Sequence, residues 1–292
     1  MAFSVFKKEE ITLDKTKKTE LKKLACKVRM GVIEGTYNAK SGHPGGSLSI
    51  ADIITYLYFE EMHVDPKDPA WEDRDRFVLS KGHTAPALYS ALALKGFFPF
   101  ELIKTLRKPD SNLQGHPSMR YTPGVDMSTG SLGQGISAAV GMALGAKLKG
   151  KNFRVYTALG DGEIEEGQVW EAAMFAGNHK LDNLVAVVDY NNLQIDGSLD
   201  EVNSPCPIDE KFAAFGWNVL VINGHCFDEI DEAFKKAKEF KGKPTCIVAK
   251  TVKGKGVSFM EDKCDWHGSA PNAEQYEQAM KELGDALAAL EV

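Results

Sequence analysis

The sequence predicts an α/β fold, a doubly wound parallel sheet with helices on both faces. Short apolar segments of strand length alternate with helical segments through residues 71–250. Strand–helix–strand alternation implies right-handed crossovers and parallel strands. The segment LVAVVDY at residues 184–190 is almost wholly apolar, as expected for a strand whose sheet is covered on both faces.

Each element follows from its local pattern. Residues 17–37 carry apolar side chains at helical spacing, and Ser49 is a plausible N-cap for a second helix that runs to Met62. Residues 109–133 form a loop, and a loop of that length in a compact domain is usually functional. The other helices are expected at 84–95, 165–178, 208–215, 227–240 and 273–290, and the strands at 77–79, 153–159, 184–190, 217–222 and 245–249.

Length and composition fit an ordinary globular protein of one large or two small domains. The chain has 292 residues, 43% hydrophobic and 26% charged, with a net charge of −6. We expect one domain over 1–292, with an N-terminal helical region 1–70, a core 71–250 and a C-terminal loop and helix 251–292. The acidic balance argues against nucleic-acid binding. No apolar stretch is long enough for a membrane span, and the first twenty residues lack the core of a signal peptide, so we expect a cytoplasmic protein.

The strongest chemical signal is GDG at 160–162, followed by NN at 191–192. Asp161 follows a strand and precedes a helix, so it lies at the edge of a parallel sheet where ligands bind. A phosphate suits a helix N-terminus but is repelled by a carboxylate, and a divalent cation between them resolves the conflict. Asn191 follows about one strand–helix–strand unit later and could share the ion with a backbone carbonyl such as that of Leu193. The alternative is that the asparagines are simple turn residues.

The histidines provide a second signal. Glycine-rich loops are poor places for a core histidine and good places for ligand contacts. His63 and His179, near helix ends, are expected to be structural, and the role of His225, in NGH after a strand, is left open. Four histidines lie in such loops: His43 in SGHPGG, His83 in SKGHTAP, His116 in LQGHPS and His267 in DWHGSAP.

With these segments the chain strongly resembles the transketolase family, from about residue 21 to 270. The resemblance implies the thiamin diphosphate-binding fold of the diphosphate (PP) domain. It also implies thiamin diphosphate with Mg²⁺ or Ca²⁺ as cofactors, and transfer of a two-carbon ketol unit from a ketose phosphate to an aldose phosphate, as in the pentose phosphate pathway. It rests on SGHPGGSLSIADI, DRFVLSKGHTAPALYSAL, GHPS, TPGVDMSTGSLGQGISAAVGMALG, the GDG…NN unit and TVKGKGVSFMEDKCDWHGSAP.

The resemblance also implies roles for individual residues around the cofactor. The metal ion would be bound by Asp161, Asn191 and the carbonyl of Leu193. The diphosphate would be contacted by Gly162, His83 and His267. The aminopyrimidine end would lie near Gly130, Ser131 and Leu132. Many relatives have proline in place of Ser131, a mild change because the contact there is mostly with the backbone.

Other residues would serve the reaction itself. Val252 matches a branched apolar residue that packs under the thiazolium. Glu166 would reach across the subunit interface toward the partner's catalytic glutamate. The substrate channel would be lined by His43, His116 and His267, which would hydrogen-bond the donor's hydroxyl groups.

The resemblance does not extend to the second domain of transketolases, which supplies the catalytic glutamate and the phosphate-binding arginines. It therefore implies the N-terminal subunit of a split transketolase, with a separate C-terminal pyrimidine-domain subunit, in a homodimer of heterodimers. Two alternatives stay open. One is the α-subunit of a thiamin diphosphate 2-oxoacid dehydrogenase, which is not expected to carry the histidine motifs. The other is a non-catalytic cofactor-binding module. The donor and acceptor sugars are also left open.

Overall fold

The computed structural model describes residues 13–291, so most of the segment searched for a signal peptide lies outside the described residues. Five parallel strands form one sheet in the order β1-β2-β3-β5-β4. The predicted doubly wound parallel sheet is confirmed. The strands are β1 (Arg76–Leu79), β2 (Val155–Gly160), β3 (Leu184–Tyr190), β4 (Asn218–Asn223) and β5 (Thr245–Lys250).

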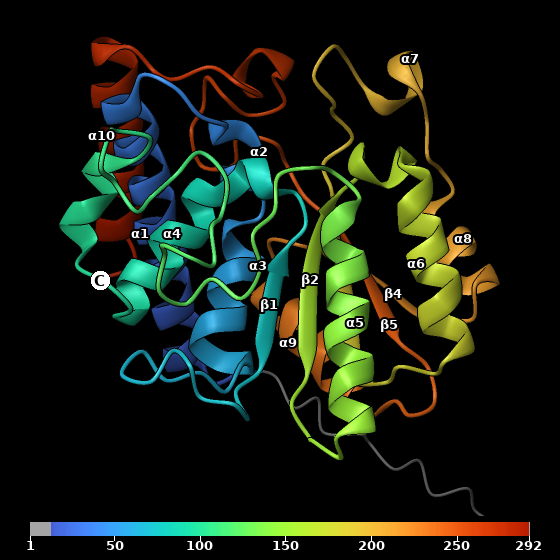
Figure 1. The fold of residues 1–292 in the computed structure, drawn as a ribbon. Coiled ribbons are helices and arrows are strands. Elements are labelled where there is room, and N and C mark those ends of the chain that lie inside the picture. Colours follow the sequence, from blue (N-terminus) through green and yellow to red (C-terminus); the bar gives the residue numbers. More distant parts are fainter. Residues whose placement is uncertain (1–12, 292) are drawn as a thin grey trace, which may run out of the picture.

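Helices cover both faces of the sheet (Figure 1). The larger core lies on one face, under α1 (Lys15–Ala39), α3 (Ala51–Tyr56), α4 (Ala85–Lys95) and α9 (Phe227–Glu239), with α10 (Ala273–Ala288) against α1. The second core lies on the other face, under α5 (Gln134–Leu148), α6 (Gly167–Asn178) and α8 (Ile208–Ala214).

Strand β3 shows why its sequence is apolar throughout. Val185 and Val187 point into the first core, whereas Leu184, Ala186 and Val188 point into the second. Successive side chains of a strand face opposite sides of the sheet. A strand with a hydrophobic core on each side therefore needs apolar residues at both sets of positions.

The structure corrects the second helix of the sequence analysis. Residues 49–62 do not form one helix capped by Ser49. Ser49 ends a short helix, and its hydroxyl donates to the Gly46 carbonyl and to the Asp189 carboxylate. The segment is divided into α2 (Pro44–Ser49), α3 (Ala51–Tyr56) and a π-helix, η1 (Leu57–Glu61). Pro44 occupies the first turn of α2, where its fixed φ and missing N–H suit a helix start.

Smaller differences occur elsewhere. The helix predicted from residue 165 is preceded by a 3₁₀ turn, η4 (Glu163–Glu165). A short helix that was not predicted is α7 (Leu199–Val202), whose start carries a capping box formed by Ser198 and Glu201. The remaining 3₁₀ turns are η2 (Gly82–Thr84), η3 (Phe100–Thr105) and η5 (Cys264–Trp266).

The carboxyl ends of all five strands open onto one edge of the sheet. Gly160 pairs with Asp189 across β2 and β3, so Asp161 lies beside the chain that leads to Asn191. Within residues 13–291, no helix is both long and apolar enough to cross a membrane. The division of the domain into three regions stays a prediction.

Candidate functional site

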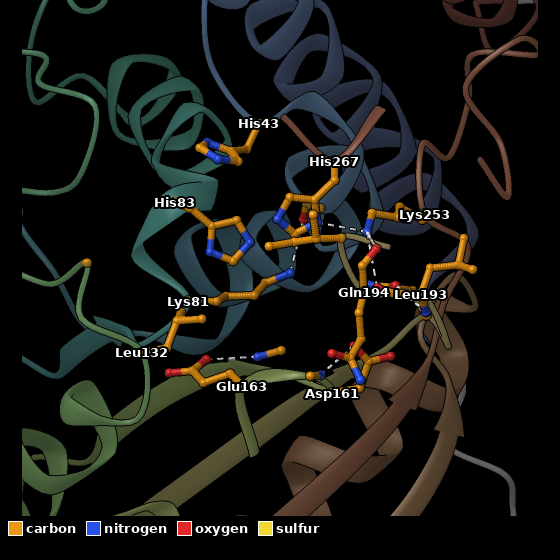
Figure 2. Close-up of a pocket in the computed structure, with 16 residues that line it drawn as sticks. His43, Lys81, His83, Leu132, Asp161, Glu163, Leu193, Gln194, Lys253 and His267 are labelled. Atoms are coloured by element: carbon orange, nitrogen blue, oxygen red, sulfur yellow. Dashed lines mark hydrogen bonds between the residues drawn. The ribbon is translucent and has the colours of Figure 1, made fainter. Parts of the chain in front are cut away.

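A pocket of about 270 Å³ lies at the carboxyl edge of the sheet (Figure 2). It brings together loops that follow β1, β2, β3 and β5 and the loop before α2. The predicted site residues that line it are His43, His83, Gly130, Leu132, Asp161, Gly162, Asn191, Leu193 and His267. Lys81, Gln194, Lys253 and Glu163 also line it and were not predicted.

Asp161 lies on the acidic side of the pocket, low in Figure 2. Its carboxylate accepts hydrogen bonds from the backbone N–H groups of Gly162 (2.9 Å) and Asn192 (2.6 Å). Burial, and then the nearby Asp189 carboxylate, raise the pKa of Asp161 to about 7. A carboxyl group in this environment is stabilised in its ionised form by a cation.

The two other predicted metal ligands follow β3. Asn191 is 8% exposed, and its side-chain oxygen accepts from the Leu193 N–H at 3.2 Å. The Leu193 carbonyl accepts from the Lys253 ammonium at 3.1 Å. The three oxygen atoms predicted to bind the metal therefore lie along one short stretch of the pocket. Lys253 already contacts one of them, the Leu193 carbonyl.

Three histidines form the opposite side of the pocket (Figure 2). The ring centroids of His43 and His83 are 5.2 Å apart, those of His83 and His267 5.2 Å, and those of His43 and His267 5.6 Å. Burial is the main cause that lowers the pKa of all three, to about 4 for His43 and about 3 for His267. Nearby cations, chiefly Arg107, Lys81 and Lys253, add to this effect. The three rings are therefore neutral at pH 7.

Two buried lysines lie between the histidines and the acidic side. Lys81 is 2% exposed, forms an ion pair with Asp189 and donates to the Gly46 carbonyl at 3.0 Å. Lys253 is 1% exposed and contacts Nδ1 of His267 at 2.9 Å. Burial lowers the pKa of Lys253 to about 8. Buried cations beside neutral histidines make this side suited to an anion.

The comparison with protein families identifies this arrangement. The family profile described as the thiamine diphosphate binding domain of transketolase matches residues 21–290. The chain belongs to the transketolase family.

Its relatives in the transketolase family are of two lengths. It is 53% identical to a 6-deoxy-6-sulfo-D-fructose transketolase subunit of Clostridium sp. (strain MSTE9), over 83% of this chain and 88% of the relative. It is 44% identical to an apulose-4-phosphate transketolase subunit of Phocaeicola vulgatus, over 91% and 94%. Against mouse transketolase, 44% identity covers 92% of this chain but 43% of the relative. The chain thus corresponds to the N-terminal subunit of split transketolases.

The fold comparison agrees. The crystal structure of Campylobacter jejuni transketolase superposes with a TM-score of 0.85 at 37% identity, over 90% of this chain and 42% of that one. The predicted thiamin diphosphate-binding fold is therefore confirmed, together with the transketolase resemblance.

The pocket fits a diphosphate with a divalent ion. A carboxylate, a side-chain amide and a backbone carbonyl are hard oxygen donors, which Mg²⁺ and Ca²⁺ prefer. Within residues 13–291 there is no group of three or more histidine, cysteine, aspartate or glutamate side chains that could hold a metal. The set of Asp161, Asn191 and Leu193 contains one such side chain, so it suits an ion that takes its remaining ligands from phosphate oxygens and water.

Asp189 connects the loops that build the transketolase pocket. Its buried carboxylate accepts from the Ser49 and Thr251 hydroxyls, from Lys81, and from the Asn191 amide at 3.3 Å. These four partners come from α2 and the loops after β1, β5 and β3. Burial opposes ionisation of Asp189, but Lys81 and the hydroxyl donors hold its pKa below the usual range.

Three predicted residues lie near the pocket without lining it. His116 is exposed and packs against Gly130, where a Cβ would come within 3.0 Å of its ring. Gly130 also has a φ of 146°, so a side chain there would be strained as well as crowded. Ser131 is exposed between two lining residues, and the Val252 N–H donates to Nε2 of His225 at 2.9 Å.

Glu166 is exposed at the start of α6, outside the pocket lining. The glutamate that lines the pocket is Glu163, which is 3% exposed. It accepts from the Ser80 hydroxyl and from the N–H groups of Gly133 (3.0 Å) and Gly160 (2.9 Å). Burial raises the pKa of Glu163. Nothing in the acidic run GDGEIEEG distinguishes these glutamates before the fold is known.

Proposed function

We propose that this chain is the cofactor-binding subunit of a split transketolase, which transfers a two-carbon ketol unit from a ketose phosphate to an aldose phosphate. The observation that carries the proposal is the pocket in which Asp161, Asn191 and Leu193 lie opposite three neutral histidines. A separate C-terminal subunit supplies the catalytic glutamate, and two such pairs form a homodimer of heterodimers. The names of the two shorter relatives, which are themselves subunits, support this division.

The acidic side of the pocket would hold the metal ion, and the diphosphate would lie between that ion and the side formed by the histidines and lysines. Asp161, Asn191 and the Leu193 carbonyl are the proposed ligands of Mg²⁺ or Ca²⁺. Gly162, His83 and His267 are the proposed contacts of the diphosphate. The Gly162 N–H donates to Asp161 in this structure and the Leu193 carbonyl accepts from Lys253, so both contacts would rearrange or be shared when the cofactor binds.

The other roles concern the reactive end of the cofactor and the substrate. Thiamin diphosphate, when bound, supplies the carbon nucleophile and the electron sink for ketol transfer. Gly130, Ser131 and Leu132 would lie at its aminopyrimidine end, and Val252 under its thiazolium ring. Glu166 would contact the partner subunit.

The histidines would act on substrate hydroxyls. His43 and His267 are neutral at pH 7, so each ring can donate one hydrogen bond and accept another. Nδ1 of His43 is buried and has no hydrogen-bond partner within residues 13–291. We assign Nδ1 of His43 to a hydrogen bond with a hydroxyl group of the ketose donor. His116 would lie at the outer part of the substrate channel.

Titration calorimetry with thiamin diphosphate and Mg²⁺, followed by turnover assays, tests the proposal. The full chain alone should give no ketol transfer, and activity should appear when the C-terminal subunit, sought in an adjacent reading frame, is added. Transketolase activity of the chain alone would contradict the split arrangement. Asp285→Asn, which changes an exposed carboxylate on α10, is the matched control for substitutions in the pocket.

The natural sugar is the most open part of the proposal. Relatives at 53% and 44% identity are named for 6-deoxy-6-sulfo-D-fructose and for apulose 4-phosphate, so the donor panel should include sulfonated and branched sugars beside ordinary ketose phosphates. The pentose phosphate pathway and a cytoplasmic location remain predictions.

A further inference from the structure

His225 lies in the loop after β4, and its ring bridges two parts of the molecule. Nδ1 is 2.7 Å from the Asp52 carboxylate, and Nε2 is 2.9 Å from the backbone N of Val252. A backbone N–H can only donate, so Nε2 must be the acceptor. Nδ1 therefore carries the hydrogen and donates it to Asp52, and these two contacts fix both the tautomer and the orientation of the ring.

Asp52 is itself held rigidly on the helical side. Arg29 on α1 donates to both of its oxygens, at 3.1 and 2.5 Å. Arg29 is 8% exposed and Asp52 is 5% exposed. Burial opposes ionisation of Asp52, but Arg29 and His225 hold the pKa of its carboxyl below the usual range. Arg29, Asp52 and His225 thus form a chain of hydrogen bonds from α1 and α3 to the loop after β5.

Val252 is the point where this chain reaches the pocket. The next residue, Lys253, contacts the Leu193 and Gln194 carbonyls, both at 3.1 Å, and His267. Thr251 is tied to Asp189 on one side, and the Gly254 N–H donates to the Gly45 carbonyl at 3.0 Å on the other. The hydrogen bond to His225 fixes the backbone at Val252, between the contacts made by Thr251 and Gly254. The directions of the Val252 and Lys253 side chains depend on this backbone.

We propose that His225 is a positioning residue, which holds the Val252 N–H through the Arg29–Asp52–His225 chain and so sets Val252 and Lys253 at the cofactor pocket. We call the hydrogen bond from the Val252 N–H to His225 the tether. The tether is a contact within this chain, whereas its effect on cofactor binding rests on the proposed thiamin diphosphate function. His225 does not line the pocket, so we assign it no contact with substrate or cofactor.

Two substitutions separate the tether from the bulk of the ring. The amide of His225→Gln reaches the position of Nε2 and can accept from Val252. The amide of His225→Asn reaches only the position of Nδ1, so it can donate to Asp52 but not accept from Val252. Both remove the aromatic ring, so a difference between them reports the acceptor and not the loss of packing.

The first measurement is amide hydrogen exchange of residues 251–256 in the full chain without cofactor. Exchange at Val252 should rise by about tenfold or more in His225→Asn and stay within about threefold of the wild type in His225→Gln. Unchanged exchange in His225→Asn would overturn the tether. If His225→Asn fails to fold, His225→Gln still decides, because unprotected Val252 in that folded variant would contradict the acceptor role.

The second measurement is the Kd for thiamin diphosphate at saturating Mg²⁺. Loss of an outer partner of a metal ligand typically weakens a site by about 10–100-fold. His225 supports backbone beside the site and not a ligand, so we expect the lower end, about a tenfold higher Kd in His225→Asn and near wild-type affinity in His225→Gln. Equal weakening in both variants would overturn the positioning role. If the wild type binds no thiamin diphosphate even with the C-terminal subunit present, the proposed function fails, while the exchange measurement still decides whether His225 holds the Val252 N–H.

Discussion

The two sides of the pocket perturb their titratable groups in opposite directions. On the acidic side, burial and Asp189 raise the pKa of Asp161 to about 7. On the histidine side, burial and nearby cations lower the pKa of His43 to about 4 and that of His267 to about 3. The acidic side thus disfavours the negative charge of Asp161, and the histidine side disfavours a positive charge on His43 and His267. On both sides the neutral form is favoured.

This difference indicates what the pocket is built to receive. A buried carboxylate with a raised pKa gains from a cation, and buried lysines with neutral histidines gain from an anion. A metal ion bound to a diphosphate supplies both. The groups that destabilise the chain without cofactor are then the ones that stabilise the complex, so folding and cofactor binding are linked.

Asp189→Asn should have the largest effect. It leaves the Lys81 ammonium buried without its carboxylate and weakens the contacts to Ser49 and Thr251. Breaking a buried ion pair on one side typically costs about 3–5 kcal/mol, and we expect a loss of that size in urea unfolding of the full chain. The double variant Asp189→Asn, Lys81→Met should recover part of the loss. A single variant as stable as the wild type would show that this ion pair does not hold the two sides together.

Asp161→Asn should separate binding from stability. With the anionic ligand gone, we expect thiamin diphosphate to bind about 100-fold more weakly in the presence of Mg²⁺. Because the folded state disfavours the ionised carboxyl above its ordinary pKa, the cofactor-free variant should be more stable by about 1 kcal/mol at pH 8. Calorimetry and denaturant unfolding measure the two effects, with Asp285→Asn as the control. Weaker binding together with a less stable cofactor-free chain would argue for a structural role instead.

The fold could be predicted largely because its signals are local. A continuous apolar strand and the strand–helix alternation need no knowledge of distant contacts. The helix start at Ser49 was wrong because the helix begins earlier, at Pro44, and Ser49 is its last residue. The Ser49 hydroxyl donates to Asp189, a partner 140 residues away in sequence. The short α7 was missed although its capping-box residues are visible in the sequence.

The site was predicted where chemistry and spacing coincide, as at Asp161 and Asn191. Lys81 and Lys253 were missed because lysine is usually a surface residue, and only tertiary structure brings Lys81 to Asp189. Their one signal is position, since both lie in loops that follow strands. The roles of His116, Ser131, Val252 and Glu166 stay predictions, and those proposed for Val252 and Glu166 depend on a cofactor and a partner subunit.

Lys253→Met tests the anion-binding side. Lys253 contacts His267 and the Leu193 carbonyl. A hydrogen bond to a charged group is worth about 1.5–3 kcal/mol, so removing this cation should raise the Kd for thiamin diphosphate by about tenfold. The pKa of His267 should also rise, because the Lys253 charge helps to lower it; NMR titration of the ring measures this. Lys263→Met, at an exposed position, should change neither value.

His267→Gln should give the smallest effect, in the pH dependence of stability. Burial and Lys253 lower the pKa of His267 to about 3 in the folded chain, whereas an unfolded histidine titrates near 6.5. Below about pH 6.5 the unfolded chain therefore binds a proton that the folded chain does not, and stability falls as the pH decreases. The wild type should lose about 1 kcal/mol more than His267→Gln between pH 7 and 5.5 in urea unfolding without cofactor. The exposed His179→Gln serves as the control. Equal losses in the wild type and His267→Gln would mean that His267 is not held neutral by its surroundings, and the contrast between the two sides would then rest on His43 and His83 alone.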